Sequence, residues 1–597
     1  MMFRKGLLSK GRLGAICESP LLPFLLVLLV ALLFRGSGIF WDQGHHLHPD
    51  ERFLMMVTRD MRTPASFGEY LDPARSPMNP VNIGHPAFVY GTFPLHILYT
   101  AGRVTGRSGY GPLLLPGRLL SVGADLLALG FLGVLALLLL PGTPEQRHRG
   151  ALFAMLFYAV APLPVQLSHF FAADSFQNAL SLGALVLVLL SRKYPSISLP
   201  GIALGGLCMG FAVACKITGG ALLPLLLLFL LFPVQGKPFS LARSLGEGVL
   251  FLLAAYLGVR LGSPFYFASG NLLDPRISPV FLKHFREMLH WHSGKGWFPP
   301  SLQWHGMSSW HTGEQLLRYG LGLPLGIFSL GGVLLLAKKW LGGLRQQGLS
   351  LFAAAGPLLL LWGVALFTYH SLEFTKYMRY VLFAYPLLAL GGGYALAYLE
   401  RAIHESSLLR GIWGRVALGA LLMVLLLWPL AFVQIYTREH SRVTASKWLL
   451  ETIPPGAKIT YEIWDDSLPL RIPHIPWKEP QFLGLPVFDH DQSSTKWQKM
   501  REQLAQADYL VLSSGRGYES VARVPEQYPR MNRFYEKLFA GELPFRKVRT
   551  FSSFPRLELG PWSLEFDDSR AEESFRVYDH PVVHIFERTG PLSGDLY

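Results

Sequence analysis

The sequence predicts an all-α polytopic membrane protein with about eleven transmembrane helices, followed by a soluble α/β domain. Of the 597 residues, 51% are hydrophobic and only 16% are charged, which is far from the composition of a soluble protein. Apolar stretches long enough to cross a bilayer recur throughout residues 1–436. Residues 437–597 change to a charged composition with short mixed elements. These observations predict a transmembrane domain over 1–436 and a second domain over 437–597.

Apolar windows of about twenty residues mark the candidate spans. They fall near 20–40, 113–140, 150–170, 175–191, 200–216, 218–233, 246–268, 320–337, 350–368, 380–398 and 416–436. The first window follows four basic residues, Arg4, Lys5, Lys10 and Arg12. Since no small-residue cleavage site follows it, the pattern predicts an uncleaved signal-anchor helix.

The loops between these windows alternate in character. Every second loop is short and basic, as with Arg192 and Lys193 or Lys338 and Lys339, so these loops are expected in the cytoplasm together with the N-terminus. The remaining loops, including the long ones at 41–112 and 269–319, then face outward. An odd number of spans also places residues 437–597 outside, so we expect a multi-pass protein of the inner cell membrane with an extracytoplasmic C-terminal domain.

The C-terminal segment contains recognisable elements of an α/β domain. WLLETIPPGAKITYE indicates a helix, a turn and a strand, and ADYLVLSS indicates a buried strand. The net charge of +14 does not indicate nucleic-acid binding, because the basic residues are scattered among short loops. The lipid bilayer is the expected partner, and nucleic acid is not.

The stretch HHLHPDER at 45–52, directly after the first span, combines several ionisable residues. Pro49 suits the first turn of a helix, where the helix dipole favours the acids Asp50 and Glu51. An ordinary helix start accounts for one acid better than for two beside three histidines. Desolvation at the bilayer edge tunes carboxyl pKa values, so either acid is a candidate general base.

His45, His46 and His48 are candidate metal ligands, with further histidines in the loop 269–319. Adjacent histidines in a loop lack the i, i+4 spacing of a zinc-binding helix. We therefore expect no required cofactor, and a divalent metal remains the alternative.

Three more segments place charges at the outer ends of spans. Asp174, in HFFAADSFQNAL, lies in a turn between spans, where it also fits an N-terminal helix cap. Lys216, in GFAVACKITGG, lies within an apolar stretch, where a lysine usually faces a cavity or an anion, and the glycines after it permit a broken helix. Lys376 and Arg379, in EFTKYMRYVLF, are either interfacial anchors or phosphate ligands.

On these segments the sequence resembles the C-type, polyprenyl-phosphate-dependent glycosyltransferases, in the branch related to protein O-mannosyltransferases and the aminoarabinose transferase of lipid A. The resemblance consists of HPDE, HPAFVYG, FAADSF, GFAVACKITG, PPSLQW and KYMRYVLFAYPLL, in that order. C-terminal pieces such as EIWDDSLPL resemble those of bacterial phospholipid-carrier-dependent members. The chain lacks the large lumenal insertion of the eukaryotic mannosyltransferases, which puts a protein acceptor in doubt.

The resemblance implies roles for individual residues. It makes Asp50 the expected base, with Glu51 beside it, and Asp174 a second acid. It places Lys216 and Arg379, and less securely Lys376, near the phosphate of the lipid carrier. The implied partners are a polyprenyl-phosphate-linked sugar donor and a hydroxyl acceptor.

The sequence thus predicts a membrane glycosyltransferase that acts on the extracytoplasmic face with inversion at the anomeric carbon. A transporter or flippase, in which the same charges line a path, is the alternative from another class. Transporters commonly show repeated halves, and only one broken helix is evident here. A metal-dependent transferase of oligosaccharide blocks is a third possibility.

Overall fold

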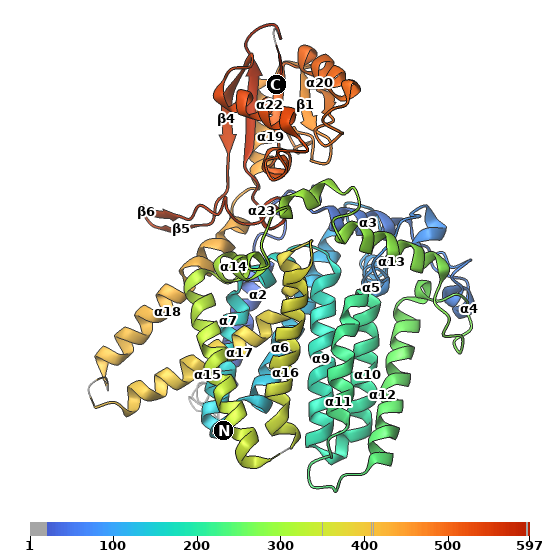
Figure 1. Cartoon of the computed structure of the whole chain (residues 1–597), viewed down its shortest axis with the longest axis vertical. Coiled ribbons are helices and arrows are strands. Elements are labelled where there is room, and N and C mark those ends of the chain that lie inside the picture. The colour runs from blue at the N-terminus through green and yellow to red at the C-terminus, as the bar shows by residue number, and fades with distance from the viewer. Residues whose placement is uncertain (1–20, 349, 408, 410, 593–594) are drawn as a thin grey trace, which may run out of the picture.

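The computed structural model describes residues 21–348, 350–407, 409, 411–592 and 595–597. The four basic residues ahead of the first predicted span, Arg4, Lys5, Lys10 and Arg12, lie outside the described residues. The described chain forms a bundle of long helices with a smaller mixed domain at one end (Figure 1). The predicted fold class, a helical membrane protein with a C-terminal β-sheet domain, is therefore confirmed.

Every predicted apolar window contains a helix. In chain order, the helices found in these windows are α2 (Leu22–Gly36), α6 (Leu114–Leu139), α7 (Pro144–Val160) with α8 (Pro162–Ser168), α9 (Ala173–Lys193), α10 (Ser198–Cys215), α11 (Leu223–Leu230), α12 (Leu241–Gly262), α15 (Leu323–Gln347), α16 (Leu351–Leu372), α17 (Ala384–Glu405) and α18 (Ile412–Val433). Within the described residues, seven helices are long and apolar enough to cross a membrane, or eight if α7 and α8, bent by 59°, form one span.

The count of about eleven spans is therefore not confirmed. Helix α2 has only 15 residues, and α11 has eight and follows the 3₁₀ turn η3 (Ile217–Leu222). At about 1.5 Å per residue, such helices are shorter than the hydrocarbon core of a bilayer. Periodicity and hydropathy locate these helices, but they do not reveal where a proline or a glycine pair interrupts a span.

Helices α10 and α12 pack closely because small residues line their contact. A Cβ atom added at Gly206 would lie 2.5 Å from the backbone oxygen of Phe251, and one added at Gly210 would lie 2.1 Å from that of Ala255. Glycines four residues apart commonly let two helix backbones touch in membranes. Because Lys216 follows α10 directly, this packing also fixes where Lys216 lies.

The shorter helices of the two long loops gather at the end of the bundle that carries the C-terminal domain (Figure 1). They are α3 (Pro49–Asp60), α4 (Phe67–Leu71), α5 (Phe93–Val104), α13 (Pro279–His292) and α14 (His311–Gln315). Helix α3 begins as the sequence predicts, with Pro49 in its first turn, and the ring of His48 accepts a hydrogen bond from the Asp50 N–H. This cap fixes the direction in which α3 leaves the bundle.

The C-terminal domain is built on a five-stranded mixed sheet. Its strands are β1 (Lys458–Glu462), β2 (Gln481–Leu485), β3 (Tyr509–Leu512), β4 (Phe545–Phe551) and β7 (Val583–Arg588), in the order β2-β1-β3-β7-β4. Strand β1 is parallel to β2 and β3, and β7 is antiparallel to β3 and β4. Helices α19 (Ser441–Thr452), α20 (Ser494–Gln506), α21 (Arg516–Val521) and α22 (Pro529–Ala540) complete it. The predicted helix, turn and strand correspond to α19 and β1, and ADYLVLSS contains β3.

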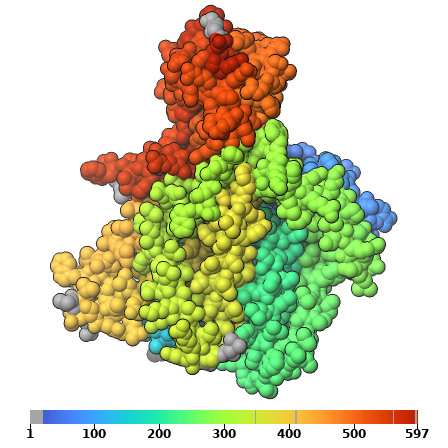
Figure 2. Space-filling model, in the orientation of Figure 1, coloured from blue at the N-terminus to red at the C-terminus, as the bar shows by residue number. Residues whose placement is uncertain are grey.

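One C-terminal segment returns to the helical bundle. It includes α23 (Glu573–Arg576), and Ala571 and Phe575 pack in the same hydrophobic core as the membrane helices. The hairpin of β5 (Arg556–Leu559) and β6 (Trp562–Glu565) extends beside α18. Figure 2 shows the rest of the domain as a rounded head above the helical body. The C-terminal part of the chain therefore contributes directly to the end of the bundle.

Candidate active site

Asp50 lies in the first turn of α3 and pairs with Arg379. Its Oδ2 atom accepts a hydrogen bond of 2.5 Å from Nη1 of Arg379, which belongs to the turn η7 (Met378–Val381) before α17. Burial would raise the pKa of Asp50, but the Arg379 guanidinium outweighs burial and holds this pKa well below its usual range. Asp50 is therefore an ionised carboxylate, and both partners remain partly exposed.

A second pair of opposite charges lies beside the first. Nζ of Lys216 donates a hydrogen bond of 3.0 Å to Asp174 at the start of α9. The same Nζ lies 4.7 Å from the centre of the Tyr380 ring, and Tyr380 directly follows Arg379. Lys216 itself has left the helical conformation at the break between α10 and η3. The fold thus brings together four of the predicted residues, Asp50, Asp174, Lys216 and Arg379.

Glu51 points into a different environment from its neighbour Asp50. Its carboxylate accepts two hydrogen bonds from Arg118, at 3.0 and 2.7 Å, and a third of 2.9 Å from the Phe171 N–H. Arg118 also binds Asp42, and these three charged side chains are fully buried. Through these contacts the Glu51 carboxylate ties α3 to α6 and to the turn before α9.

Lys376 is held by backbone groups. Its Nζ atom donates hydrogen bonds of 2.6 Å to the carbonyl oxygens of Ser371 and Glu373, and the residue is 6% exposed. These contacts cap the end of α16 and fix the turn that leads to Arg379. The structure therefore does not bring the Lys376 ammonium into the group formed by Asp50 and Arg379.

The three adjacent histidines have separate surroundings. His48 caps α3 and packs against Tyr578, and the His46 ring lies 4.3 Å from that of Tyr110. Burial lowers the pKa of both His46 and His48 to about 4. Among the described residues, no group of three or more His, Cys, Asp or Glu side chains is arranged to hold a metal ion. His45, His46 and His48 thus do not converge on one point.

A small pocket opens next to Arg379. Its lining is largely apolar and includes the polar or aromatic side chains of His48, Gln166, Tyr377, Arg379, Glu572 and Tyr578. Glu572 and Tyr578 belong to the returning C-terminal segment, and the Met378 N–H donates a hydrogen bond of 2.9 Å to Oε1 of Glu572. The candidate site is therefore shared between the membrane helices and the C-terminal part of the chain.

Two buried charged residues near the candidate site, Arg118 and Glu572, were not among the residues singled out from the sequence. Arg118 lies inside the apolar window 113–140, so the rule that draws attention to Lys216, a charge within a span, also applies to it. Glu572 lies in a charged segment, EESFR, where nothing in the sequence distinguishes it from a surface acid. Its burial depends on a contact with Met378, about two hundred residues away along the chain.

Comparison with solved structures identifies a related fold. The oligosaccharyltransferase AglB of Archaeoglobus fulgidus, tethered to an acceptor peptide, matches 87% of this chain and 72% of its own, with 12% identity and a TM-score of 0.50. The same enzyme with an inhibitory peptide and a dolichol-phosphate matches over 92% and 74%, again with 12% identity and a TM-score of 0.50. ArnT of Cupriavidus metallidurans, bound to undecaprenyl phosphate, matches less closely, with 15% identity, coverage of 84% and 94% and a TM-score of 0.45.

No protein-family model matches the chain, and no curated protein sequence matches it at a significant level. At 12% identity the similarity to AglB concerns the fold alone. It extends over most of both chains, and it includes the membrane helices as well as the C-terminal part. The chain therefore has the fold of the oligosaccharyltransferase AglB.

Proposed function

We propose that the protein transfers a sugar from a polyprenyl-phosphate donor to a hydroxyl acceptor, which is a lipid, a glycan or a protein. The observation that carries the proposal is the pair formed by Asp50 and Arg379 beside the pair formed by Asp174 and Lys216. A carboxylate next to two cations, at the end of a helical bundle, suits a donor whose tail lies in the bilayer and whose phosphate lies at its edge. The AglB structure with a dolichol-phosphate has the same fold, which supports this class of donor.

In the proposed reaction, Asp50 removes the proton from the acceptor hydroxyl. The acceptor oxygen attacks the anomeric carbon as the bond from that carbon to the phosphate oxygen breaks, and the configuration inverts. The lipid phosphate leaves with the electron pair, and Arg379 and Lys216 stabilise the charge that develops on it. Asp174 holds Lys216 in place, and Glu51 holds α3.

The pair of Asp50 and Arg379 also explains how a strongly acidic carboxyl becomes a base. While Arg379 binds Asp50, the carboxylate is stabilised and attracts protons weakly. A phosphate that competes for the Arg379 guanidinium weakens this contact, so donor binding raises the proton affinity of Asp50 before the acceptor reacts. The proposal assigns charge compensation to Lys216 and Arg379, and His45, His46 and His48 have no part in it.

The direct test uses purified protein, radiolabelled polyprenyl-phosphate sugars and a membrane extract as the source of acceptors. We expect label to pass from the carrier to a product that depends on the protein and on its Asp50. Transport of a labelled carrier across sealed vesicles, with no change in its chemical bonds, would instead favour a flippase.

We further propose that the site faces the extracytoplasmic side of the inner membrane and that the N-terminus is cytoplasmic. Arg75→Cys in the loop 41–112 and Glu526→Cys in the C-terminal domain should react with an impermeant thiol reagent in intact cells. Arg345→Cys, near the C-terminal end of α15, lies in a loop expected to be cytoplasmic and should react only after permeabilisation. Labelling in the reverse pattern would contradict this orientation, and the unsubstituted chain measures the background from native cysteines.

Loss of either cation should weaken donor binding. Each charge-assisted contact contributes roughly 1.5–3 kcal/mol, so Lys216→Met and Arg379→Met should each lower the affinity for a polyprenyl phosphate by about 10-fold or more. The two effects should not add, because both cations bind one small anion. Titration with the carrier, for the single and double variants, measures this.

The structural alternative is that Lys216 serves only to pair with Asp174. In that case, Lys216→Met destabilises the fold, Asp174→Asn in the same chain restores stability, and the affinity of the folded protein for the carrier stays unchanged. Thermal unfolding in detergent, run beside the titrations, distinguishes this outcome from loss of a phosphate contact.

A further inference from the structure

The hairpin of β5 and β6 has one apolar face and one polar face. Residues directly opposite each other in an antiparallel pair point to the same face, and successive residues of a strand alternate between faces. Leu557 pairs with Leu564, and Trp562 lies two residues before Leu564 in β6, so these three side chains share one face. The other face carries only polar side chains, those of Arg556, Glu558, Ser563 and Glu565.

The described residues cover little of the apolar face. Leu557, in the strand next to α18, is 7% exposed, but Leu564 is 50% exposed and Trp562 is 78% exposed. All four residues of β6 are exposed. A two-stranded hairpin is at best marginally stable in water when nothing packs on its apolar face, and exposed apolar patches commonly mark a contact with lipid or protein. The outer strand therefore requires a partner.

The apolar face points toward the membrane part of α18. The Phe566 N–H donates a hydrogen bond of 2.8 Å to the Pro555 carbonyl oxygen, which continues the ladder beyond β6. Phe566 therefore lies on the same face as Leu564, two residues before it. Its ring centre is 5.9 Å from that of Trp428, which lies five residues, or about 7.5 Å, before the end of α18. The face that carries Trp562 thus begins at a level within the apolar helix.

The base of the hairpin is fixed where α18 ends. The Glu558 N–H donates a hydrogen bond of 3.3 Å to Oε1 of Gln434, in the turn η8 (Gln434–Thr437), and Nη2 of Arg438 donates one of 2.6 Å to the Phe554 carbonyl oxygen. Figure 1 shows the hairpin pointing sideways from this junction, and Figure 2 shows it as an arm above α18. An arm in this position runs along the surface of a bilayer that α18 crosses.

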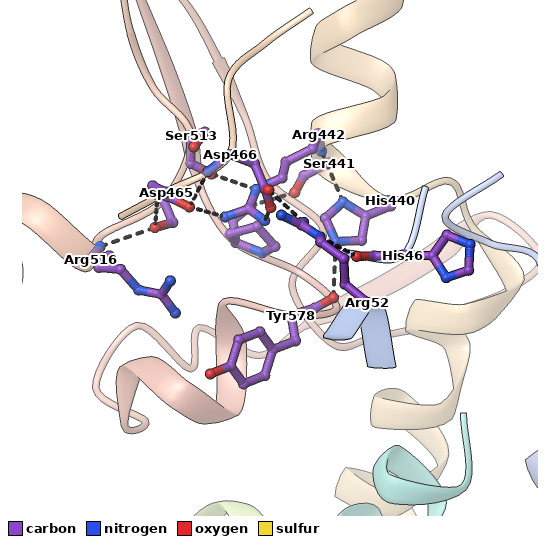
Figure 3. Close-up of polar contacts among 12 residues, drawn as sticks. His46, Arg52, His440, Ser441, Arg442, Asp465, Asp466, Ser513, Arg516 and Tyr578 are labelled. Atoms are coloured by element: carbon purple, nitrogen blue, oxygen red, sulfur yellow. Dashed lines mark hydrogen bonds and ion pairs between the residues drawn. The ribbon is translucent and has the colours of Figure 1, made fainter. Parts of the chain in front are cut away.

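Neighbouring ion pairs restrain the C-terminal domain above the helices. Arg442, in the first turn of α19, donates hydrogen bonds of 2.6 Å to Asp465 and of 2.5 Å to Asp466. Asp466 also accepts a hydrogen bond of 2.6 Å from Arg52 of α3 (Figure 3). The connection from α18 to the sheet domain is thus tied to a helix of the bundle, which keeps the hairpin close to the end of α18.

We propose that the apolar face of this hairpin binds the lipid bilayer, with Trp562 and Leu564 at the boundary between the headgroups and the acyl chains. Tryptophan favours this boundary, because its ring is apolar and its N–H can still bond to water or to a headgroup. Leu430, three residues before the end of α18, is also exposed, so lipid that surrounds α18 reaches the level of the hairpin. This continuity selects lipid rather than a protein as the partner.

The lipid contact lies next to the segment that completes the candidate site. The hairpin is followed directly by residues 566–579, in which Phe575 packs in the core of the membrane helices. Asp579 accepts hydrogen bonds of 2.8 Å from Gln166 of α8 and from Tyr436 of η8. The hairpin and the returning segment therefore hold the C-terminal part at two neighbouring points, one on lipid and one on the helices. This inference does not depend on the proposed function.

The test attaches the environment-sensitive fluorophore nitrobenzoxadiazole to each face of the hairpin in the full chain. Leu564→Cys places it on the apolar face, and Ser563→Cys, the adjacent residue of β6, places it on the polar face as the matched control. The protein is reconstituted at one copy per lipid nanodisc, so no second copy can cover the hairpin. Quenching is measured with nitroxide-bearing phosphatidylcholine, which acts from the bilayer, and with iodide, which acts from water. The unsubstituted chain measures labelling of native cysteines.

We expect the probe at Leu564→Cys to emit at shorter wavelength than the probe at Ser563→Cys, to be quenched by the nitroxide lipid and to be protected from iodide. The probe at Ser563→Cys should show the opposite order. Adding Trp562→Ser to Leu564→Cys should weaken quenching by the lipid, because the hairpin loses its largest apolar side chain. Thermal unfolding of each variant checks that the chain is folded.

Two outcomes would overturn the inference. Quenching of both probes by iodide, with none by the nitroxide lipid, would show that the hairpin lies in water. A probe at Leu564→Cys that neither quencher reaches would show that protein covers this face.

Discussion

Asp50→Asn is expected to lower the rate of sugar transfer by roughly 10²- to 10⁴-fold, the usual contribution of a general base. The side chain keeps its shape, so α3 and its cap should be retained. Affinity for the lipid carrier should stay the same or rise, because the substitution removes the anion that competes with phosphate for Arg379. The combination of lost turnover and retained donor binding separates a base from a donor-binding residue.

Glu51→Gln provides the comparison within the same helical turn. It should lower the thermal stability of the protein, since the Glu51 carboxylate neutralises part of the buried Arg118 charge. Measured per folded molecule, its turnover should exceed that of Asp50→Asn. Near-normal turnover of Asp50→Asn together with an inactive, stable Glu51→Gln protein would identify Glu51 as the base.

The contrast between these two acids shows where prediction from the sequence ends. Their position at a helix start follows from Pro49 and from the preference of acids for the first turn. Successive residues of a helix, however, point about 100° apart. One carboxylate therefore reaches Arg379 and the other Arg118, and only the packed structure reveals which.

The positions of the helices and strands were easier to predict from the sequence than the contacts between them. Apolar windows located the membrane helices because burial in lipid requires long apolar stretches. The strands β1 and β3 were recognisable because a buried strand concentrates β-branched and aromatic residues. Lys216 and Arg379 were predicted to lie near a common phosphate, and the fold places both next to Tyr380. The contribution of Glu572 was not predictable, because it depends on a long-range contact in an otherwise ordinary acidic segment.

Arg118→Met is expected to have the largest effect on stability. The Arg118 guanidinium is the shared partner of Asp42 and Glu51, and all three side chains are fully buried. Removing one partner of a buried ion pair costs about 3–5 kcal/mol, because the remaining charge is left uncompensated. Here two carboxylates would be left, so the folded protein should be obtained in low yield and should unfold at a markedly lower temperature in detergent.

Arg276→Met is the matched control, because the Arg276 side chain is exposed where it pairs with Asp274, and ion pairs at the surface contribute at most about 1 kcal/mol. Adding Asp42→Asn and Glu51→Gln to Arg118→Met removes the uncompensated charges, so stability should partly return. An unfolding temperature equal to that of Arg276→Met would show that Arg118 does not hold α3, and with it Asp50, against the membrane helices.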